Sequence, residues 1–170
     1  MPKRPLTFRL VPHLHMSSGR AIGFLEGDDQ LDAGPVFDDL KDKQEWLVRS
    51  RMELWVDGHN RPDEYFHGYP NNPRYDRCFT FKWKEKRVRQ RFYGFLCNPQ
   101  PVTNRGFRLC VLTIHATKTE FETDLAELDR VNQWRTNWRA KEAIRTIYHE
   151  FERVLFCCHL LCVVMSQICL

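Results

Sequence analysis

Five basic side chains in the middle of the chain have the types that metal-free cleavage of RNA requires. They are Lys82, Lys84, Arg91, His115 and Lys118. In that reaction a base removes the 2′-hydroxyl proton, cations stabilise the charge on the phosphorus, and an acid protonates the leaving 5′-oxygen. Clustered cations lower one another's pKa, which favours a lysine as the base. Arg91 stays charged and can bind a phosphate through two hydrogen bonds.

His115 has two interpretations at this stage. An imidazole titrates near neutrality, so His115 suits the role of acid or base. It also follows an apolar run, and a core histidine with one hydrogen-bonded nitrogen fits that position equally well.

The positive charge of the chain is local. Residues 77–91 carry seven Lys or Arg and one acid, a net charge of +6, whereas the whole chain carries +4, so the remainder sums to about −2. Cations gathered on one sheet face repel one another unless a polyanion binds there. A solvated edge strand that resists aggregation is the alternative. We expect RNA to contact four further residues of this region: Lys86, Arg87, Arg89 and Tyr93.

Period-two alternation indicates the strands that position these residues. Between Cys78 and Leu96, apolar and basic residues alternate on both sides of a tight turn near Lys86, which predicts two paired strands. The run from Phe107 to Thr117 is apolar and β-branched and predicts a central strand buried on both faces.

The flanking segments predict supporting elements. Two short strands are expected near the N-terminus, at Thr7–Val11 and Ala21–Leu25. Apolar residues at helical spacing predict a helix from about Val36 to Val56, followed by a Pro- and aromatic-rich loop over residues 58–76. Another helix is expected to begin near Asp124.

The cysteines favour a reducing compartment. Their number, seven, is odd, and their scatter does not form a disulfide framework, so we expect a cytoplasmic protein. Cys157, Cys158, His159 and Cys162 lie close in sequence but on different sides of one apolar helix, so we expect no metal ion, and no cofactor. The last 17 residues predict a buried or partner-facing helix; a membrane tail is the less favoured alternative.

The order of these segments resembles the RelE/ParE toxin superfamily, and within it the HigB-like, phage-derived Gp49-like branch. The resemblance covers roughly Phe37 to Val131 and rests on Lys82-Trp83-Lys84, on Arg91 seven residues after the second lysine, and on Lys118 after the last strand. The Glu-Thr-Asp-x-x-Glu-Leu start of the following helix adds to it. In ribosome-dependent members, residues at the positions of Lys82, Lys84 and Arg91 contribute to catalysis.

The resemblance implies an α+β fold, with a small mainly antiparallel sheet of about four strands, an N-terminal helical segment packed on it and a C-terminal helix. It divides the chain into an N-terminal extension (1–35), a toxin domain (36–150) and an apolar Cys-rich helix or tail (151–170). The implied function is that of a type II toxin, an endoribonuclease that cleaves mRNA on the ribosome, inhibits translation and is silenced by a cognate antitoxin. A ParE-like DNA gyrase inhibitor and a non-catalytic RNA-binding protein are the alternatives.

Overall fold

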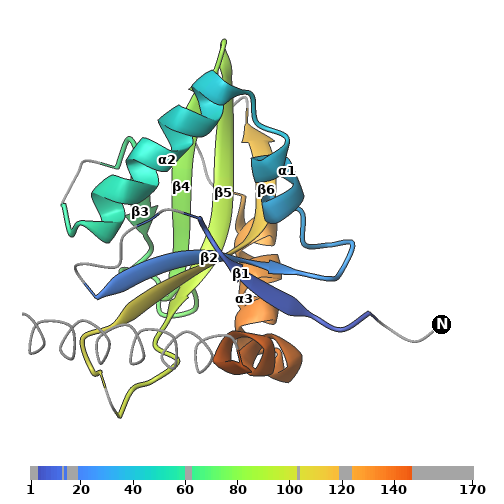
Figure 1. Ribbon diagram of the computed structural model, residues 1–170, viewed down its shortest axis with the longest axis vertical. Helices are drawn as coiled ribbons and strands as arrows, with labels where there is room; N and C mark the ends of the chain where they lie inside the picture. The colour runs from blue at the N-terminus through green and yellow to red at the C-terminus, as the bar shows by residue number, and fades with distance from the viewer. Residues whose placement is uncertain are drawn as a thin grey trace, which may run out of the picture.

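One six-stranded mixed sheet forms the framework of the computed structural model, which describes residues 4–12, 14, 19–59, 63–102, 104–118 and 124–146. The strands are β1 (Thr7–Leu10), β2 (Arg20–Glu26), β3 (Phe66–Gly68), β4 (Cys78–Glu85), β5 (Val88–Cys97) and β6 (Arg108–Lys118). Their order across the sheet is β1-β2-β6-β5-β4-β3 (Figure 1). Strands β2 and β6 are parallel, and every other neighbouring pair is antiparallel.

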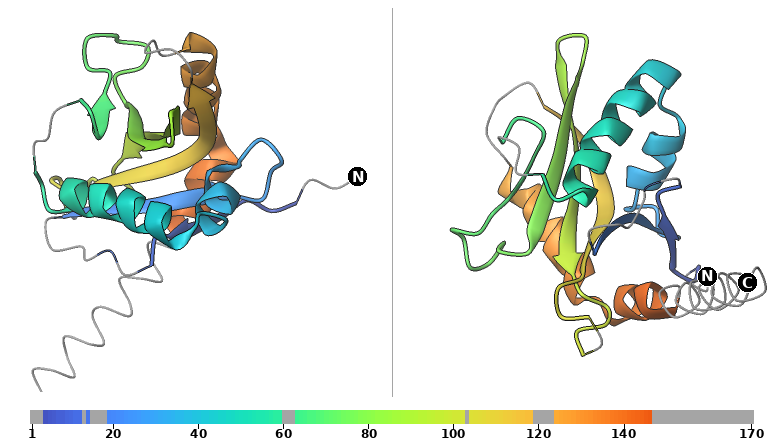
Figure 2. Two further views of the ribbon diagram at one scale, coloured as in Figure 1. Left: turned by 90° about the horizontal axis from the view of Figure 1, so that it is seen from above. Right: turned by 60° about the vertical axis from the view of Figure 1, so that its left-hand side comes forward.

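The described helices pack on both faces of this sheet. They are α1 (Ala33–Asp38), α2 (Asp42–Val56), α3 (Leu125–Thr136) and a further helical run over residues 138–146. Figure 2 shows α1 and α2 on one side of β4 and β5, and α3 on the other. Two cores result: Phe37 and Met52 pack against Phe92 on the first face, and Leu128 packs near Tyr93 on the second.

The predicted strands around the basic region are confirmed. Strands β4 and β5 form a hairpin, and β6 lies inside the sheet between β2 and β5, with Leu109–Ile114 buried. The two N-terminal strands are also present, as β1 and β2. The helix expected near Asp124 begins there, because the Asp124 carboxylate accepts a hydrogen bond of 2.9 Å from the Ala126 N–H.

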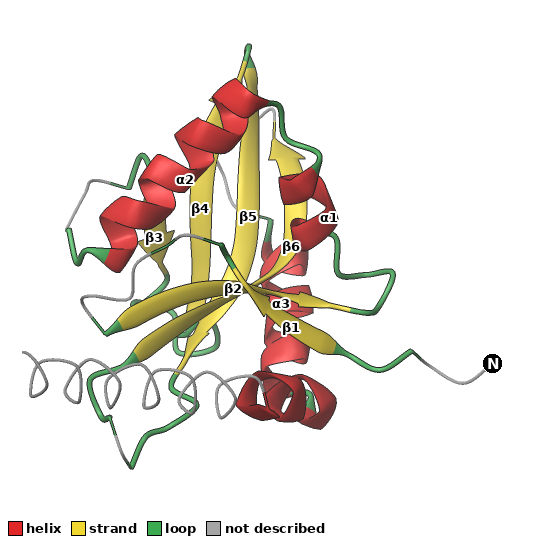
Figure 3. Ribbon diagram, in the orientation of Figure 1, coloured by secondary structure: helices red, strands yellow, loops and turns green. Residues whose placement is uncertain are grey.

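The expected sheet of about four mainly antiparallel strands is wrong. The sheet has six strands, and its parallel β2–β6 pair arises because α1 and α2 carry the chain across one face after β2 (Figure 3). Residues Ala21–Leu25 are buried, so β2 is an interior strand, hydrogen-bonded to β1 on one side and β6 on the other. Strand β3 is also unexpected, because it forms within residues 58–76, which were interpreted as a loop.

The single helix expected from Val36 to Val56 is two helices. Lys41 is extended, with ψ near 149°, and separates α1 from α2. This break lets α1 contact β6 and lets α2 pack along β4. The predicted C-terminal segment, 151–170, lies outside the described residues. No described helix has both the length and the apolarity needed to cross a membrane.

Candidate functional site

Four of the predicted cations lie together on one face of the β4–β5 hairpin. Lys82 is the direct cross-strand partner of Arg91, and Lys84 is the partner of Arg89. Paired residues in an antiparallel ladder point to the same face, with Cβ atoms about 4.5–5.5 Å apart. We call these four residues the basic surface.

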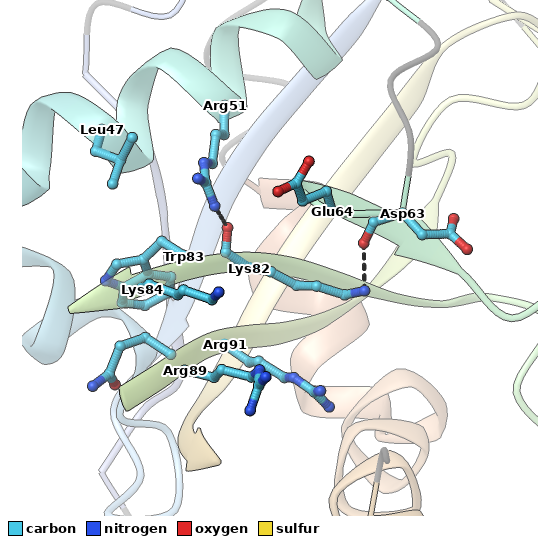
Figure 4. Close-up of a pocket in the computed structure, with 10 residues that line it drawn as sticks. Leu47, Arg51, Asp63, Glu64, Lys82, Trp83, Lys84, Arg89 and Arg91 are labelled. Carbon is cyan, nitrogen blue, oxygen red and sulfur yellow. Dashed lines mark hydrogen bonds between the residues drawn. The ribbon is translucent and has the colours of Figure 1, made fainter. Parts of the chain in front are cut away.

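The basic surface borders a cleft of about 350 Å³ at the edge of β4 (Figure 4). The strand β3 pairs with β4 only from Phe79 to Phe81, so the cleft opens where the edge of β4 continues beyond it. Helix α2 and the residues just before β3 form the other walls. The lining residues are Leu47, Arg51, Asp63, Glu64, Lys82, Trp83, Lys84, Arg89, Gln90 and Arg91.

Lys82 is a half-buried lysine whose ammonium donates a hydrogen bond to the Asp63 carbonyl oxygen. Burial lowers its pKa below the ordinary lysine value, the neighbouring Arg91 guanidinium lowers it further, and Asp63 opposes the change. A lysine with a lowered pKa is a better proton acceptor at neutral pH than an exposed one. The pKa lowering expected for a lysine of this cluster is therefore present at Lys82, with burial as its largest cause and the Arg91 charge as the second.

Arg91 is the most buried member of the basic surface, with 4% of its area exposed. Its Nη1 donates a 3.0 Å hydrogen bond to the Tyr93 hydroxyl. Tyr93 is fully buried, and burial raises the pKa of its phenol, so the hydroxyl stays protonated. Tyr93 was predicted to contact RNA, and the structure places it beneath Arg91 as a support.

His115 lies on the opposite face of the sheet from the basic surface. It pairs with Phe92, whereas Ala116 pairs with Arg91. Its ring packs near Trp83 and Phe92, with centroids 5.8 and 5.6 Å away, and its Nε2 lies 2.7 Å from the Gln90 side-chain oxygen. Burial lowers its pKa, although Asp32 and Glu127 oppose the change. This geometry matches the core-histidine interpretation and separates His115 from the four cations.

Lys118 lies on the same face of the sheet as the basic surface, but its ammonium contacts helix α3. Its Nζ lies 3.0 Å from Glu127 Oε2 of α3, and both side chains are about 85% buried. The contact is an ion pair without hydrogen-bond geometry, because Glu127 Oε2 is a buried atom with no hydrogen-bond partner among the described residues. Lys118 pairs across the ladder with Arg89, yet it does not line the cleft.

The two remaining predicted residues occupy the hairpin turn. Lys86 and Arg87 are exposed and connect β4 to β5. Lys86 has φ of +55°, the left-handed conformation that tight hairpin turns require. Neither lines the cleft, but both extend its positive charge to the tip of the hairpin.

Three charged residues of the cleft were not anticipated from the sequence. Arg51 of α2 crosses the edge of β4 and donates from Nη1 to the Lys82 carbonyl oxygen, and its guanidinium lies 4.5 Å from the centre of the Tyr65 ring. Glu64 brings a carboxylate to the same rim, and Asp63 contributes the backbone carbonyl oxygen that accepts from Lys82. The sequence signal for Asp63 and Glu64 was indirect: they lie in the Pro- and aromatic-rich segment 58–76, and a loop of that length in a compact domain is uncommon unless it is functional.

Metal ligands do not gather within the part of the chain that the structure describes. No group of three or more His, Cys, Asp or Glu side chains there is arranged to hold a metal ion. Cys78, Cys97 and Cys110 are free thiols, and burial raises the pKa of each. The cysteine cluster considered above, residues 157–162, lies outside the described residues.

Comparisons with known proteins give no match. No protein-family model, no curated protein and no solved structure matches this chain. Membership of the RelE/ParE superfamily therefore stays a prediction from the sequence.

Proposed function

We propose that the basic surface binds single-stranded RNA and cleaves it without a metal ion. The observation that carries the proposal is the convergence of Lys82, Lys84, Arg89 and Arg91 on one face, at the mouth of one cleft. Four cations in direct cross-strand pairs cost folding free energy unless an anion neutralises them, and the phosphodiester backbone supplies such anions.

The chemistry follows from the position of each cation. Neutral Lys82 accepts the 2′-hydroxyl proton, and the 2′-oxygen then attacks the adjacent phosphorus. Arg89 and Arg91 donate hydrogen bonds to the non-bridging oxygens, where negative charge grows. The bond from phosphorus to the 5′-oxygen breaks, and the Lys84 ammonium supplies the proton that this oxygen needs. The products are a 2′,3′-cyclic phosphate and a free 5′-hydroxyl.

This reaction agrees with the toxin function that the sequence resemblance implies. On that proposal the substrate is mRNA on the ribosome in the cytoplasm, and cleavage stops translation. A cognate antitoxin would inhibit the protein by covering the basic surface with acidic side chains.

The test is expression of the protein followed by mapping of RNA 5′ ends in the cell. The Lys84→Ala variant should relieve growth arrest and remove the cleavage products, because Lys84 is exposed and its loss should leave the fold intact. Lys43→Ala removes an exposed cation from α2, outside the cleft, and should remain as toxic as the wild type. Equal cleavage by wild type and Lys84→Ala would refute the proposal.

Non-catalytic RNA binding is the second candidate, and one observation favours it. Two of the five residues predicted to be catalytic do not line the cleft, since His115 faces the other side of the sheet and Lys118 pairs with Glu127. A binding protein needs only the four cations. It would retain RNA in a salt-dependent manner and yield no new 5′ ends.

A further inference from the structure

The two sides of the cleft differ in chemistry. Every charged residue that β4 and β5 contribute to the lining is a cation. The other side, formed by α2 and the residues just before β3 and called here the α2 side, combines the Arg51 guanidinium, the Glu64 carboxylate and the apolar side chain of Leu47 (Figure 4). A carboxylate repels a phosphate, so a site for phosphate alone would not include Glu64. The α2 side therefore suits an uncharged group that both accepts and donates hydrogen bonds.

Arg51 is held in place before any ligand arrives. The Lys82 carbonyl oxygen accepts a hydrogen bond from Nη1, and the Tyr65 ring lies 4.5 Å from the guanidinium carbon. An arginine fixed on two sides loses little side-chain freedom when it binds a further acceptor. Among the described residues, Lys82 supplies the only hydrogen-bond acceptor that Arg51 contacts, so donors remain for a ligand.

Glu64 adds acceptors next to these donors. Its side chain is exposed, and in Figure 4 its carboxylate lies on the side toward Arg51, whereas the Asp63 carboxylate points away. The Glu64 charge also acts on the Arg51 guanidinium, so the two groups are electrostatic neighbours. A carboxylate only accepts and a guanidinium only donates, so the pair offers adjacent acceptors and donors.

We infer that Arg51 and Glu64 bind a guanine base next to the phosphate held by the basic surface. Guanine presents N7 and O6 as acceptors on its major-groove edge, and the N1–H and the 2-amino group as donors on the adjoining Watson–Crick edge. Arginine reads O6 and N7 with two hydrogen bonds, and a carboxylate can accept from N1–H and the 2-amino group. Leu47 and Trp83 supply the apolar wall that a base plane needs. This inference rests on the proposed binding of RNA.

The test measures the affinity of short oligonucleotides by fluorescence anisotropy. The probes are uridine heptamers with guanine, inosine or adenine at the central position, and 2′-O-methyl sugars prevent the proposed cleavage. The wild type should bind the guanine probe about tenfold more tightly than the adenine probe, a difference typical of one well-formed base contact. Inosine lacks the 2-amino group and should bind with intermediate affinity.

Two variants locate the preference. Glu64→Gln should reduce the guanine preference to about twofold or less while retaining salt-dependent binding, because the basic surface is unchanged. Glu53→Gln makes the same chemical change on an exposed part of α2 that does not line the cleft, and should keep the full preference.

The outcomes separate this inference from the proposed function. Equal affinity of the wild type for all three probes, or an undiminished preference in Glu64→Gln, would overturn the guanine site and leave RNA binding standing. Failure of every probe to bind at low salt would overturn both. Thermal unfolding of each variant checks that the fold is retained.

Discussion

Lys82 of β4 and Arg91 of β5 are direct cross-strand partners, and each cation donates a hydrogen bond to a different group, one at the rim of the cleft and one buried beneath the basic surface. The Asp63 carbonyl oxygen holds Lys82, and the Tyr93 hydroxyl holds Arg91. Two cations placed side by side and partly removed from water destabilise the folded state. On the proposed function, a bound phosphate would reduce the repulsion between them.

This relationship predicts that Lys82→Met stabilises the protein at neutral pH. Removing this half-buried charge should raise the free energy of unfolding by about 1 kcal/mol and, on the proposed function, abolish RNA cleavage. The pKa of Lys82 is lowered on folding, so between the folded pKa and about pH 10.5 the unfolded chain binds more protons and wild-type stability rises with pH. The advantage of Lys82→Met should thus shrink at alkaline pH. Urea denaturation at neutral and alkaline pH measures both effects, and a variant less stable than wild type at neutral pH would contradict them.

We predict that His67 on β3 makes the folded protein less stable in acid. Burial, with the nearby charge of Lys82, lowers its pKa to about 4, and its Nδ1 is buried without a hydrogen-bond partner among the described residues. Below the ordinary histidine pKa of about 6.5, the imidazole is protonated in the unfolded chain but stays neutral in the folded protein. The free energy of unfolding therefore falls as the pH drops toward 4. The pKa shift corresponds to roughly 3 kcal/mol of unfolding free energy. Because the ring is incompletely buried, solvent screening reduces the expected loss to about 1–2 kcal/mol.

His67→Phe is the variant that isolates this effect. It keeps an aromatic ring beside Tyr69, whose ring centroid lies 4.6 Å from that of His67, and it cannot titrate. Urea midpoints measured through the acid range should fall less steeply for the variant than for the wild type. The decline that persists in the variant includes the contribution of His115, whose pKa is also lowered. If the urea midpoints of the variant and the wild type fell in parallel with pH, His67 would not be the cause of the acid destabilisation.

We predict that Lys118 has a structural role, in its ion pair with Glu127, and not a catalytic one. Lys118→Met alone leaves a buried carboxylate without its cation and should cost about 2–4 kcal/mol of stability. Adding Glu127→Leu removes that carboxylate and should recover most of the loss. RNA cleavage by the folded double variant should stay near the wild-type rate. A double-mutant cycle of unfolding free energies, with an RNA cleavage assay, measures both. An intact fold with no cleavage would instead assign Lys118 to the reaction.

The sequence predicted the basic surface because the alternation of a half-buried strand is a local signal. Phe79, Phe81 and Trp83 alternate with Thr80 and the basic residues, and this pattern decides which side chains share a face. The N-terminal strands and the start of α3 were likewise visible in local patterns. These features depend on near neighbours in the chain, so single-sequence reasoning can find them.

Features that depend on distant pairing were not predictable in this way. Strand β6 is buried on both faces from Leu109 to Ile114, so its apolar run carries no alternation that could assign a face to His115. The bulge between Tyr93 and Gly94 shifts the register as well. The parallel pairing of β2 with β6, and the approach of Arg51 to Lys82, join segments more than 30 residues apart.

We predict that Gly94, at the register shift between β5 and β6, is the position near the site where a small substitution does most damage. A Cβ atom added there would lie 2.2 Å from the Val111 carbonyl oxygen, and backbone on the central strand β6 cannot move aside cheaply. Gly94→Ala should therefore cost more than about 3 kcal/mol, by forcing β5 away from β6 and displacing Tyr93 and Arg91. Gly68→Ala on β3 is the matched control, since its Cβ meets nothing closer than 3.7 Å. Thermal unfolding of the two variants tests the contrast, and equal midpoints would mean that the bulge has room for a side chain.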